Sequence, residues 1–190
     1  MNAASVHTIH VTVMALIPME RELFQITERW DVEAMCGFLA QPELYWQIND
    51  HLSPQPEALN WREYVSRQDV ATYAATWEGN IVGYVQFLKR TSVGAEMTVA
   101  FREGFRGRIA KTLTLAAMAN AFEKKMLLKL WATVPTDNRL ALRAAVHIGM
   151  RKEGQLTKSI VRADGVRDLV LFGITRDEFL RGHKGNGATP

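Results

Sequence analysis

FRGRIAK, at residues 105–111, joins an apolar strand pattern at Met97–Phe101 to a long apolar helix pattern. The first backbone N–H groups of a helix have no partners within it, and the helix dipole favours an anion there. Gly107 lets the backbone approach a ligand closely. Positive charge around it comes from Arg106, Arg108 and Lys111. We interpret this turn as a phosphate-binding site rather than a solvated helix start.

The composition is that of one globular domain. The chain has 190 residues, of which 47% are hydrophobic and 23% charged, and its formal net charge is +3. This length can enclose a full hydrophobic core, and so mild a charge does not by itself indicate a nucleic-acid partner. The single cysteine, Cys36, lies in an apolar helical pattern and fits a buried small hydrophobe in a reducing compartment. The five histidines lack metal-ligand spacing, so we expect no metal.

Three regions divide the chain. Residues 1–20 form an N-terminal extension whose apolar alternation suits an extra strand or a loose arm. Residues 21–180 form the domain, and the Gly-rich, polar residues 181–190 are expected to be a disordered tail. No apolar run is long enough to cross a bilayer, and no basic residue precedes the short run in the extension. We therefore expect a cytoplasmic protein without a membrane partner.

The hydrophobic periodicity predicts a mixed α/β order. Strands are expected at Leu23–Thr27, Ala71–Trp77, Ile81–Leu88, Met97–Phe101, Leu127–Val134, Glu153–Arg162 and Val166–Ile174, with hairpin turns at Glu78–Asn80 and Asp164–Gly165. Helices are expected at Val32–Ala40, about Glu57–Arg67, Gly107–Lys124, and from a cap at Thr136 or Asp137 to Gly149. Pro42 is expected to stop the first helix. The strand–helix–strand unit at residues 97–134 implies a parallel pair with a right-handed crossover.

Four segments in this order resemble the GNAT superfamily of acyl-CoA-dependent N-acetyltransferases, and are most similar to its ribosomal-protein N-terminal branch. They are the hairpin at 78–84, the turn at 105–111, the helix region 138–150 that starts at Asn and ends at Gly-Met, and the closing strand at 168–179. The resemblance spans roughly residues 23–179. It implies a largely antiparallel sheet whose central parallel pair is splayed around the cofactor, with helices on both faces.

The resemblance also implies a site for acetyl-CoA. Amides of the turn would take the pyrophosphate, strand residues would hydrogen-bond the pantetheine arm, and Asn138 would face the arm or the leaving sulfur. The cofactor-binding residues would be Val99, Phe101, Arg106, Gly107, Arg108, Ile109, Ala110, Lys111 and Asn138. The turn departs from the family pattern Arg-Gly-x-Gly-x-Gly/Ala, because a glycine is missing between Arg108 and Ile109. The family's general-acid tyrosine is matched here by Ala145, so that role is not carried over.

An attacking amine must lose a proton, so a base near the thioester is useful. Glu96, at the start of the strand pattern, is the first candidate, against the alternative of a solvated strand-end charge. His51 is a second candidate for the base, in the aromatic loop that would cover and bind the acceptor, although a surface histidine without a role is favoured. Tyr84 could line the acceptor pocket or simply pack in the core. The cluster Tyr45, Trp46 and Trp61 could likewise form core or cleft wall, and core packing is favoured.

These observations favour an N-acetyltransferase that moves an acetyl group from acetyl-CoA to a protein N-terminus or a small amine. Two alternatives stay open: a non-catalytic acyl-CoA-binding module, and a related enzyme that modifies nucleic-acid bases or tRNA. A nucleotide-triphosphate enzyme is disfavoured because the turn lacks the GxxxxGK[ST] spacing. A Rossmann fold is disfavoured because the turn comes late in the chain. The chain is expected to be a monomer or a homodimer.

Overall fold

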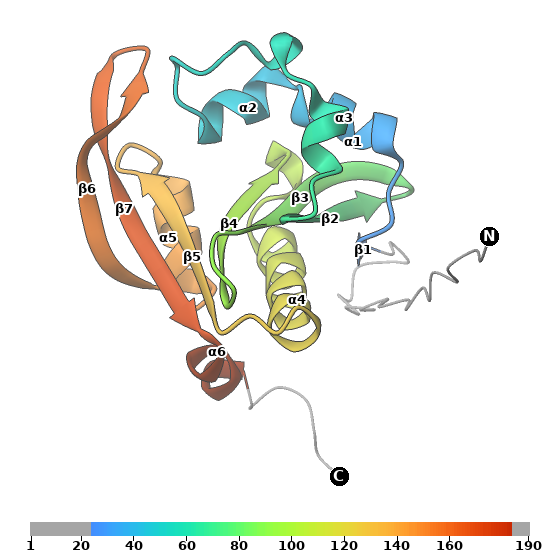
Figure 1. Ribbon diagram of the computed structural model, residues 1–190, viewed down its shortest axis with the longest axis vertical. Coiled ribbons are helices and arrows are strands. Elements are labelled where there is room, and N and C mark those ends of the chain that lie inside the picture. Colours follow the sequence, from blue (N-terminus) through green and yellow to red (C-terminus); the bar gives the residue numbers. More distant parts are fainter. Residues whose placement is uncertain (1–23, 184–190) are drawn as a thin grey trace.

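The computed structural model describes residues 24–183, which form a seven-stranded sheet with helices on both faces (Figure 1). The strands are β1 (Phe24–Thr27), β2 (Val70–Trp77), β3 (Asn80–Lys89), β4 (Gly94–Phe101), β5 (Lys129–Pro135), β6 (Arg151–Arg162) and β7 (Gly165–Thr175), in the spatial order β1-β2-β3-β4-β5-β7-β6. The predicted extension at 1–20 and residues 184–190 of the predicted tail lie outside the described residues.

Six α-helices and two 3₁₀ turns connect the described strands. They are α1 (Val32–Leu39), α2 (Pro42–Ile48), η1 (Pro56–Ala58), α3 (Trp61–Val65), η2 (Glu103–Phe105), α4 (Arg108–Lys124), α5 (Arg139–His147) and α6 (Arg176–His183). All neighbouring strands are antiparallel except β4 and β5. This arrangement confirms the predicted fold class.

β4 and β5 stay together for only three residues each. Their parallel register runs from Gly94 opposite Lys129 to Glu96 opposite Trp131. Beyond that point β4 remains paired with β3 through Phe101, while β5 remains paired with β7 through Pro135. The two strands therefore diverge in the middle of the sheet (Figure 1). The inner edges of both are left without a strand partner, as the predicted splay requires.

Successive residues of the central strands point to opposite faces, and each face has its own core. Val85 is fully buried in the larger core, which includes Leu113 and Met118 of α4. Its neighbour Tyr84 lies on the other face, in the core that α1, α2 and α3 cover. There the Tyr84 ring meets Phe38 of α1 edge to face, with ring centroids 6.2 Å apart. The sheet thus separates α4 and α5 from the three early helices.

Several predicted elements differ from the structure. α1 ends before Pro42, as expected, but Pro42 also opens α2, which was not predicted. Proline is tolerated in the first turn of a helix, where N–H groups need no helical partner. The predicted helix at 57–67 is η1 followed by the short α3, whose N-cap Asn60 accepts a hydrogen bond from the Glu63 N–H. α5 is capped by Asn138 rather than by Thr136 or Asp137.

Two differences concern the end of the chain. The last hairpin turns at residues 163–164, so Gly165 already belongs to β7. Residues 181–183 continue helix α6 rather than starting the predicted tail. By contrast, Gly149 has a φ of +90° directly after the C-cap Ile148, which confirms the predicted glycine stop of α5.

The end of α2 and the loop after it are bonded to β6. Arg162 Nη1 donates to the carbonyl oxygens of Trp46 (2.8 Å) and Asn49 (3.0 Å). The Asp50 carboxylate accepts the backbone N–H groups of Val161 (2.8 Å) and Leu52 (2.7 Å). We call these contacts the α2–β6 bridge. They hold together segments 113 and 116 residues apart in sequence.

Candidate active site

A groove of about 800 Å³ opens where β4 and β5 diverge. Its walls are the free edges of the two strands, the start of α4, and α5. The groove brings together every predicted cofactor residue except Ile109: its lining includes Val99, Phe101, Arg106, Gly107, Arg108, Ala110, Lys111 and Asn138. Ile109 instead packs against the larger core. We call this site the basic groove.

The start of α4 presents unused hydrogen-bond donors to the basic groove. The first intrahelical bond runs from the Lys111 N–H to the Gly107 carbonyl at 3.0 Å, so the three preceding N–H groups have no helical acceptor. No side chain caps this end, whereas Asp31 and Asn138 cap α1 and α5. Gly107 has a φ of +78°, a conformation that favours glycine. The turn is therefore shaped to leave its amides available to an anion.

The charged side chains along the groove are mainly positive. Four lysine and arginine side chains line it: Arg106, Arg108, Lys111 and Arg143. Glu96 is the sole carboxylate among the lining residues. Arg106 also has a structural contact, because its Nε lies 3.2 Å from the Phe101 carbonyl and so fixes the end of β4. The lining fits a ligand with several negative charges.

Asn138 caps α5 from within the groove. Its Oδ1 accepts the Ala141 N–H at 3.1 Å, which orients the side-chain amide. Within residues 24–183, no acceptor is bonded to its Nδ2, which leaves that donor for a ligand. Ala145, the position at which the resemblance would place a tyrosine, is buried and lines the same groove. No tyrosine is found among the described lining residues.

Glu96 lies where the two strands part. Its Oε2 accepts hydrogen bonds from Arg90 Nη2 (2.7 Å) and Nε (3.0 Å), and its Oε1 lies 3.3 Å from Thr133 Oγ1 on β5. The side chain is only 23% exposed. These contacts distinguish Glu96 from a freely solvated strand-end charge, and they hold its carboxylate at the head of the basic groove.

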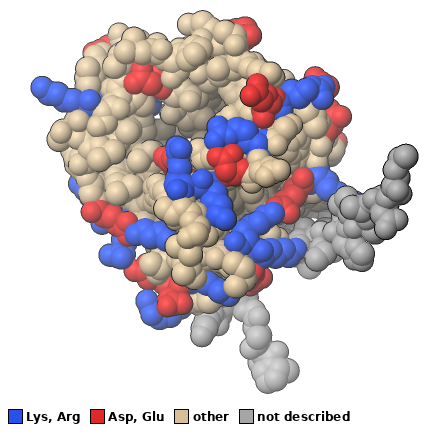
Figure 2. Space-filling model, viewed as in Figure 1, with Lys and Arg blue, Asp and Glu red and all other residues tan. Residues whose placement is uncertain are grey.

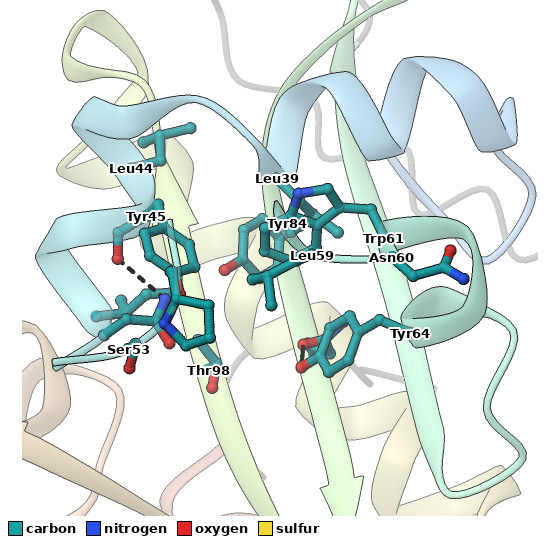
Figure 3. A pocket seen from close by; sticks show the side chains of 14 residues that line it. Leu39, Leu44, Tyr45, Ser53, Leu59, Asn60, Trp61, Tyr64, Tyr84 and Thr98 are labelled. Atoms are coloured by element: carbon teal, nitrogen blue, oxygen red, sulfur yellow. Dashed lines mark hydrogen bonds between the residues drawn. The ribbon is translucent and has the colours of Figure 1, made fainter. Parts of the chain in front are cut away.

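A second cavity of about 360 Å³ lies over β3 and β4, on the face that α1, α2 and α3 cover (Figure 3). Four aromatic side chains line it: Tyr45, Trp61, Tyr64 and Tyr84. We call this site the aromatic cavity. Ile48 and Thr98 line both the cavity and the basic groove, so the two spaces meet at these residues.

Most polar groups around the aromatic cavity are bonded within the protein. Tyr45 Oη donates to the Pro54 carbonyl (2.8 Å), and Trp61 Nε1 donates to the Pro56 carbonyl (2.7 Å). Tyr64 Oη donates to Oε1 of the buried Gln86 at 2.7 Å. These bonds fix the rings, and they resolve the two interpretations of the aromatic cluster: Tyr45 and Trp61 are packed and also form the wall.

Tyr84 is different. The residue is 2% exposed and lines the cavity, yet its hydroxyl bonds to no other group in residues 24–183. Burial, with a smaller contribution from Tyr64, raises the pKa of Tyr84 well above its ordinary value, so the hydroxyl stays protonated. The Thr98 side chain also bonds to no other described residue. The cavity thus holds two polar groups that a ligand can satisfy.

His51 lines neither space. Its ring lies 5.1 Å from the Trp46 ring, and its backbone N–H bonds to the Val161 carbonyl at 3.0 Å. Sequence reasoning did not identify Thr98, Tyr64, Gln86, Thr133 or Arg143 as site residues. The sequence could have indicated Thr98 as a site residue, because it stands two residues after Glu96 and therefore lies on the same face of the strand.

Two parallel strands diverge next to a helix that begins directly after a glycine, and a basic groove lies between the strands. This is the architecture of GNAT acyltransferases. The family model of the acetyltransferase (GNAT) family matches residues 38–150. This chain belongs to that family, and it is an acetyltransferase. The relative YokL of Bacillus subtilis (strain 168), named an SPbeta prophage-derived uncharacterized N-acetyltransferase, is 31% identical over 173 residues, which cover 81% of this chain and 97% of YokL.

Solved structures share the fold at lower identity. A spermidine N-acetyltransferase from Vibrio cholerae, in complex with CoA and spermine, aligns with a TM-score of 0.67 at 16% identity over 84% of this chain and 98% of its own. A ribosomal-protein-S5-alanine acetyltransferase from Vibrio fischeri aligns with a TM-score of 0.67 at 14% identity over 82% and 94%. At these identities the likeness concerns the fold alone.

No helix within residues 24–183 combines the length and the hydropathy that a membrane span requires. No group of three or more His, Cys, Asp or Glu side chains in this range is arranged to hold a metal ion.

Proposed function

We propose that this chain transfers an acetyl group from acetyl-CoA to a primary amine, by direct attack of the amine on the thioester. The observation that carries the proposal is the meeting of two chemically different spaces at Thr98. One is open, basic and bordered by free amides. The other is aromatic and uncharged. A reaction between a polyanionic acyl donor and an amine needs such a junction.

The basic groove has the donors that coenzyme A requires. The free amides after Gly107, with Arg108 and Lys111, would hold the diphosphate. The unpaired edge of β4 near Val99 would hydrogen-bond the pantetheine arm. Nδ2 of Asn138 would face the arm or the sulfur. The thioester supplies an acyl carbon that is already reactive toward amines, so positioning contributes much of the rate.

Glu96 would accept the proton of the attacking amine, directly or through one water. The nitrogen–carbon bond forms as the carbon–sulfur bond breaks, and the amine proton passes to the carboxylate. Thr133 and Arg90 keep that carboxylate in place. Because Ala145 has no proton to donate, the leaving thiolate would be protonated by solvent.

The test joins calorimetric titration of the full chain with acetyl-CoA to an assay of thiol release over a panel of amines. We expect saturable binding, with thiol release that depends on the added amine and matches acetylated product by mass. Binding without amine-dependent thiol release would support an acyl-CoA-binding module instead. Absence of binding would contradict the assignment of the basic groove.

A further inference from the structure

We propose that the aromatic cavity selects a compact primary amine that carries one positive charge and an apolar body, and that Tyr84 and Thr98 bind its polar end. The inference rests on the proposed function, because it takes the cavity beside the basic groove as the acceptor site. It goes further by naming the class of acceptor and the side chains that recognise it.

The lining of the aromatic cavity is uncharged. The described residues that form it are Leu39, Leu44, Tyr45, Ile48, Asn49, Ser53, Pro54, Leu59, Asn60, Trp61, Tyr64, Tyr84, Gln86 and Thr98. Figure 2 shows charged side chains of both signs over this face of the molecule, with many of the Lys and Arg side chains below the early helices. A second ammonium group placed in the aromatic cavity would lose its hydration without gaining a carboxylate. A polyamine is therefore a poor fit.

The rings provide a rigid wall for an apolar body. Trp61 meets Tyr45 and Tyr64 edge to face, with centroids 5.8 and 5.9 Å apart. Since the polar atoms of all three are bonded inside the protein, their ring surfaces are what they offer to a ligand. Aromatic faces attract apolar groups and a single cation. A volume of about 360 Å³ accommodates on the order of a dozen water-sized groups, which suits a small aryl-alkyl amine.

The polar end of the ligand has a defined place. The unpartnered hydroxyls of Tyr84 and Thr98 come from adjacent strands on the same sheet face. Glu96 stands two residues before Thr98 on this face, about 6–7 Å along the strand. An amine nitrogen bound at Thr98 therefore lies beside the one carboxylate that borders the basic groove. The amine arrives as a single ammonium, loses one proton to solvent to become the nucleophile, and passes the next proton to Glu96 as the nitrogen–carbon bond forms. The opposite end of the cavity offers only aromatic and neutral side chains.

The first test compares kcat/KM for phenethylamine, spermidine and an alanine-starting tetrapeptide at saturating acetyl-CoA. We expect phenethylamine to exceed both others at least tenfold. A higher kcat/KM for spermidine or for the peptide would overturn the inference. Calorimetric titration with acetyl-CoA tests the proposed function separately, so a preference for spermidine with normal coenzyme binding would defeat only the acceptor class.

Two variants test the recognition groups. Tyr84→Phe removes the hydroxyl and keeps the ring, so KM for phenethylamine should rise about tenfold while the Kd for acetyl-CoA is unchanged. Tyr73→Phe is the matched control, because the Tyr73 hydroxyl bonds to Asn120 on the opposite face. Leu59→Glu adds a carboxylate to the cavity and should raise kcat/KM for spermidine relative to phenethylamine. An unchanged KM in Tyr84→Phe, or an unchanged preference in Leu59→Glu, would count against the proposal.

Discussion

Thr133 Oγ1 lies 3.3 Å from Glu96 Oε1, and this contact spans the point where β4 and β5 separate. Glu96 is the last residue of β4 that is paired with β5, and Thr133 stands two residues beyond its partner Trp131. The carboxylate is thereby bonded to both strands. A base held in this way keeps a defined distance from a thioester placed between them.

Glu96→Gln should lower kcat by about 100-fold or more, because the amide keeps the shape of the side chain but cannot take up the amine proton. The Kd for acetyl-CoA should change little, since Glu96 is not part of the turn at 105–111 that is proposed to hold the diphosphate. Steady-state rates measured from about pH 6 to pH 9 would check this. Thr133→Val is a milder companion that loosens the carboxylate without removing it. Equal rates for wild type and Glu96→Gln across the pH range would exclude Glu96 as the base.

Lys111→Glu should weaken acetyl-CoA binding by about tenfold or more, because it reverses a charge at the unsatisfied start of α4. Lys124→Glu makes the same charge change at the far end of that helix and should leave the affinity within about twofold. Calorimetric titration at low and high salt would measure both, and the difference should shrink as salt screens the site. Equal affinities would place the coenzyme elsewhere.

Gly83→Ala should lower the free energy of unfolding by about 1–3 kcal/mol. An added Cβ would lie 2.3 Å from Cδ1 of the Phe101 ring, which covers Gly83 from the next strand and also borders the basic groove. Gly37→Ala is the control, since no atom lies within 4 Å of its Cβ position in α1. That change should be neutral or stabilising by up to about 1 kcal/mol. Urea unfolding of both variants distinguishes overpacking from a general intolerance of alanine.

Asp50→Asn should reduce stability at neutral pH and have a smaller effect in acid. Hydrogen bonds from the backbone N–H groups, chiefly that of Val161, hold the pKa of Asp50 below its ordinary value. When the pKa of a carboxyl is lower in the folded protein than in the unfolded chain, its ionised form stabilises the fold. This stabilisation is complete at pH values above the pKa of the unfolded chain and disappears as the pH falls through the pKa of the folded protein. The stability difference from wild type should therefore be largest near about pH 6 and shrink toward about pH 3.

Urea unfolding at several pH values would measure this difference. Asp164→Asn, at a 75% exposed side chain, should change stability by less than about 0.5 kcal/mol at either end of that range. A constant difference between wild type and Asp50→Asn would contradict the role of the Asp50 carboxylate.

Local patterns predicted the sheet well because its signals are strong. The apolar, β-favouring runs of β2 and β3, the glycine-containing turn between them and the apolar strand β5 each follow from short-range sequence. α2 was missed because Pro42 favours both a helix stop and a first helical turn, and its neighbours do not distinguish the two. The packing of Leu44 in the core on the sheet makes the choice, and this packing is a tertiary effect.

The two parts of the candidate site also differ in how far the sequence predicts them, for the same reason. The anion-binding turn is contiguous, so residues 105–111 carry its signal by themselves. The aromatic cavity combines side chains from α1, α2, α3, β3 and β4, which no local pattern brings together. Tyr84 was expected either in the core or in the acceptor pocket, and the structure shows it buried and lining the aromatic cavity. The missing partner of its hydroxyl, on which the proposed ligand contact rests, could not be read from the sequence.

If the aromatic cavity is the acceptor site proposed above, the α2–β6 bridge would make the choice of acceptor depend on strand β6, which does not line that cavity. Asn49 and Ser53 border the aromatic cavity, and Arg162 and Asp50 hold the loop that carries them. On that proposal, changes of length or sequence in the final hairpin would alter which amines enter, while the basic groove stays intact. The C-terminal hairpin would then be a place where substrate range can change without loss of coenzyme binding.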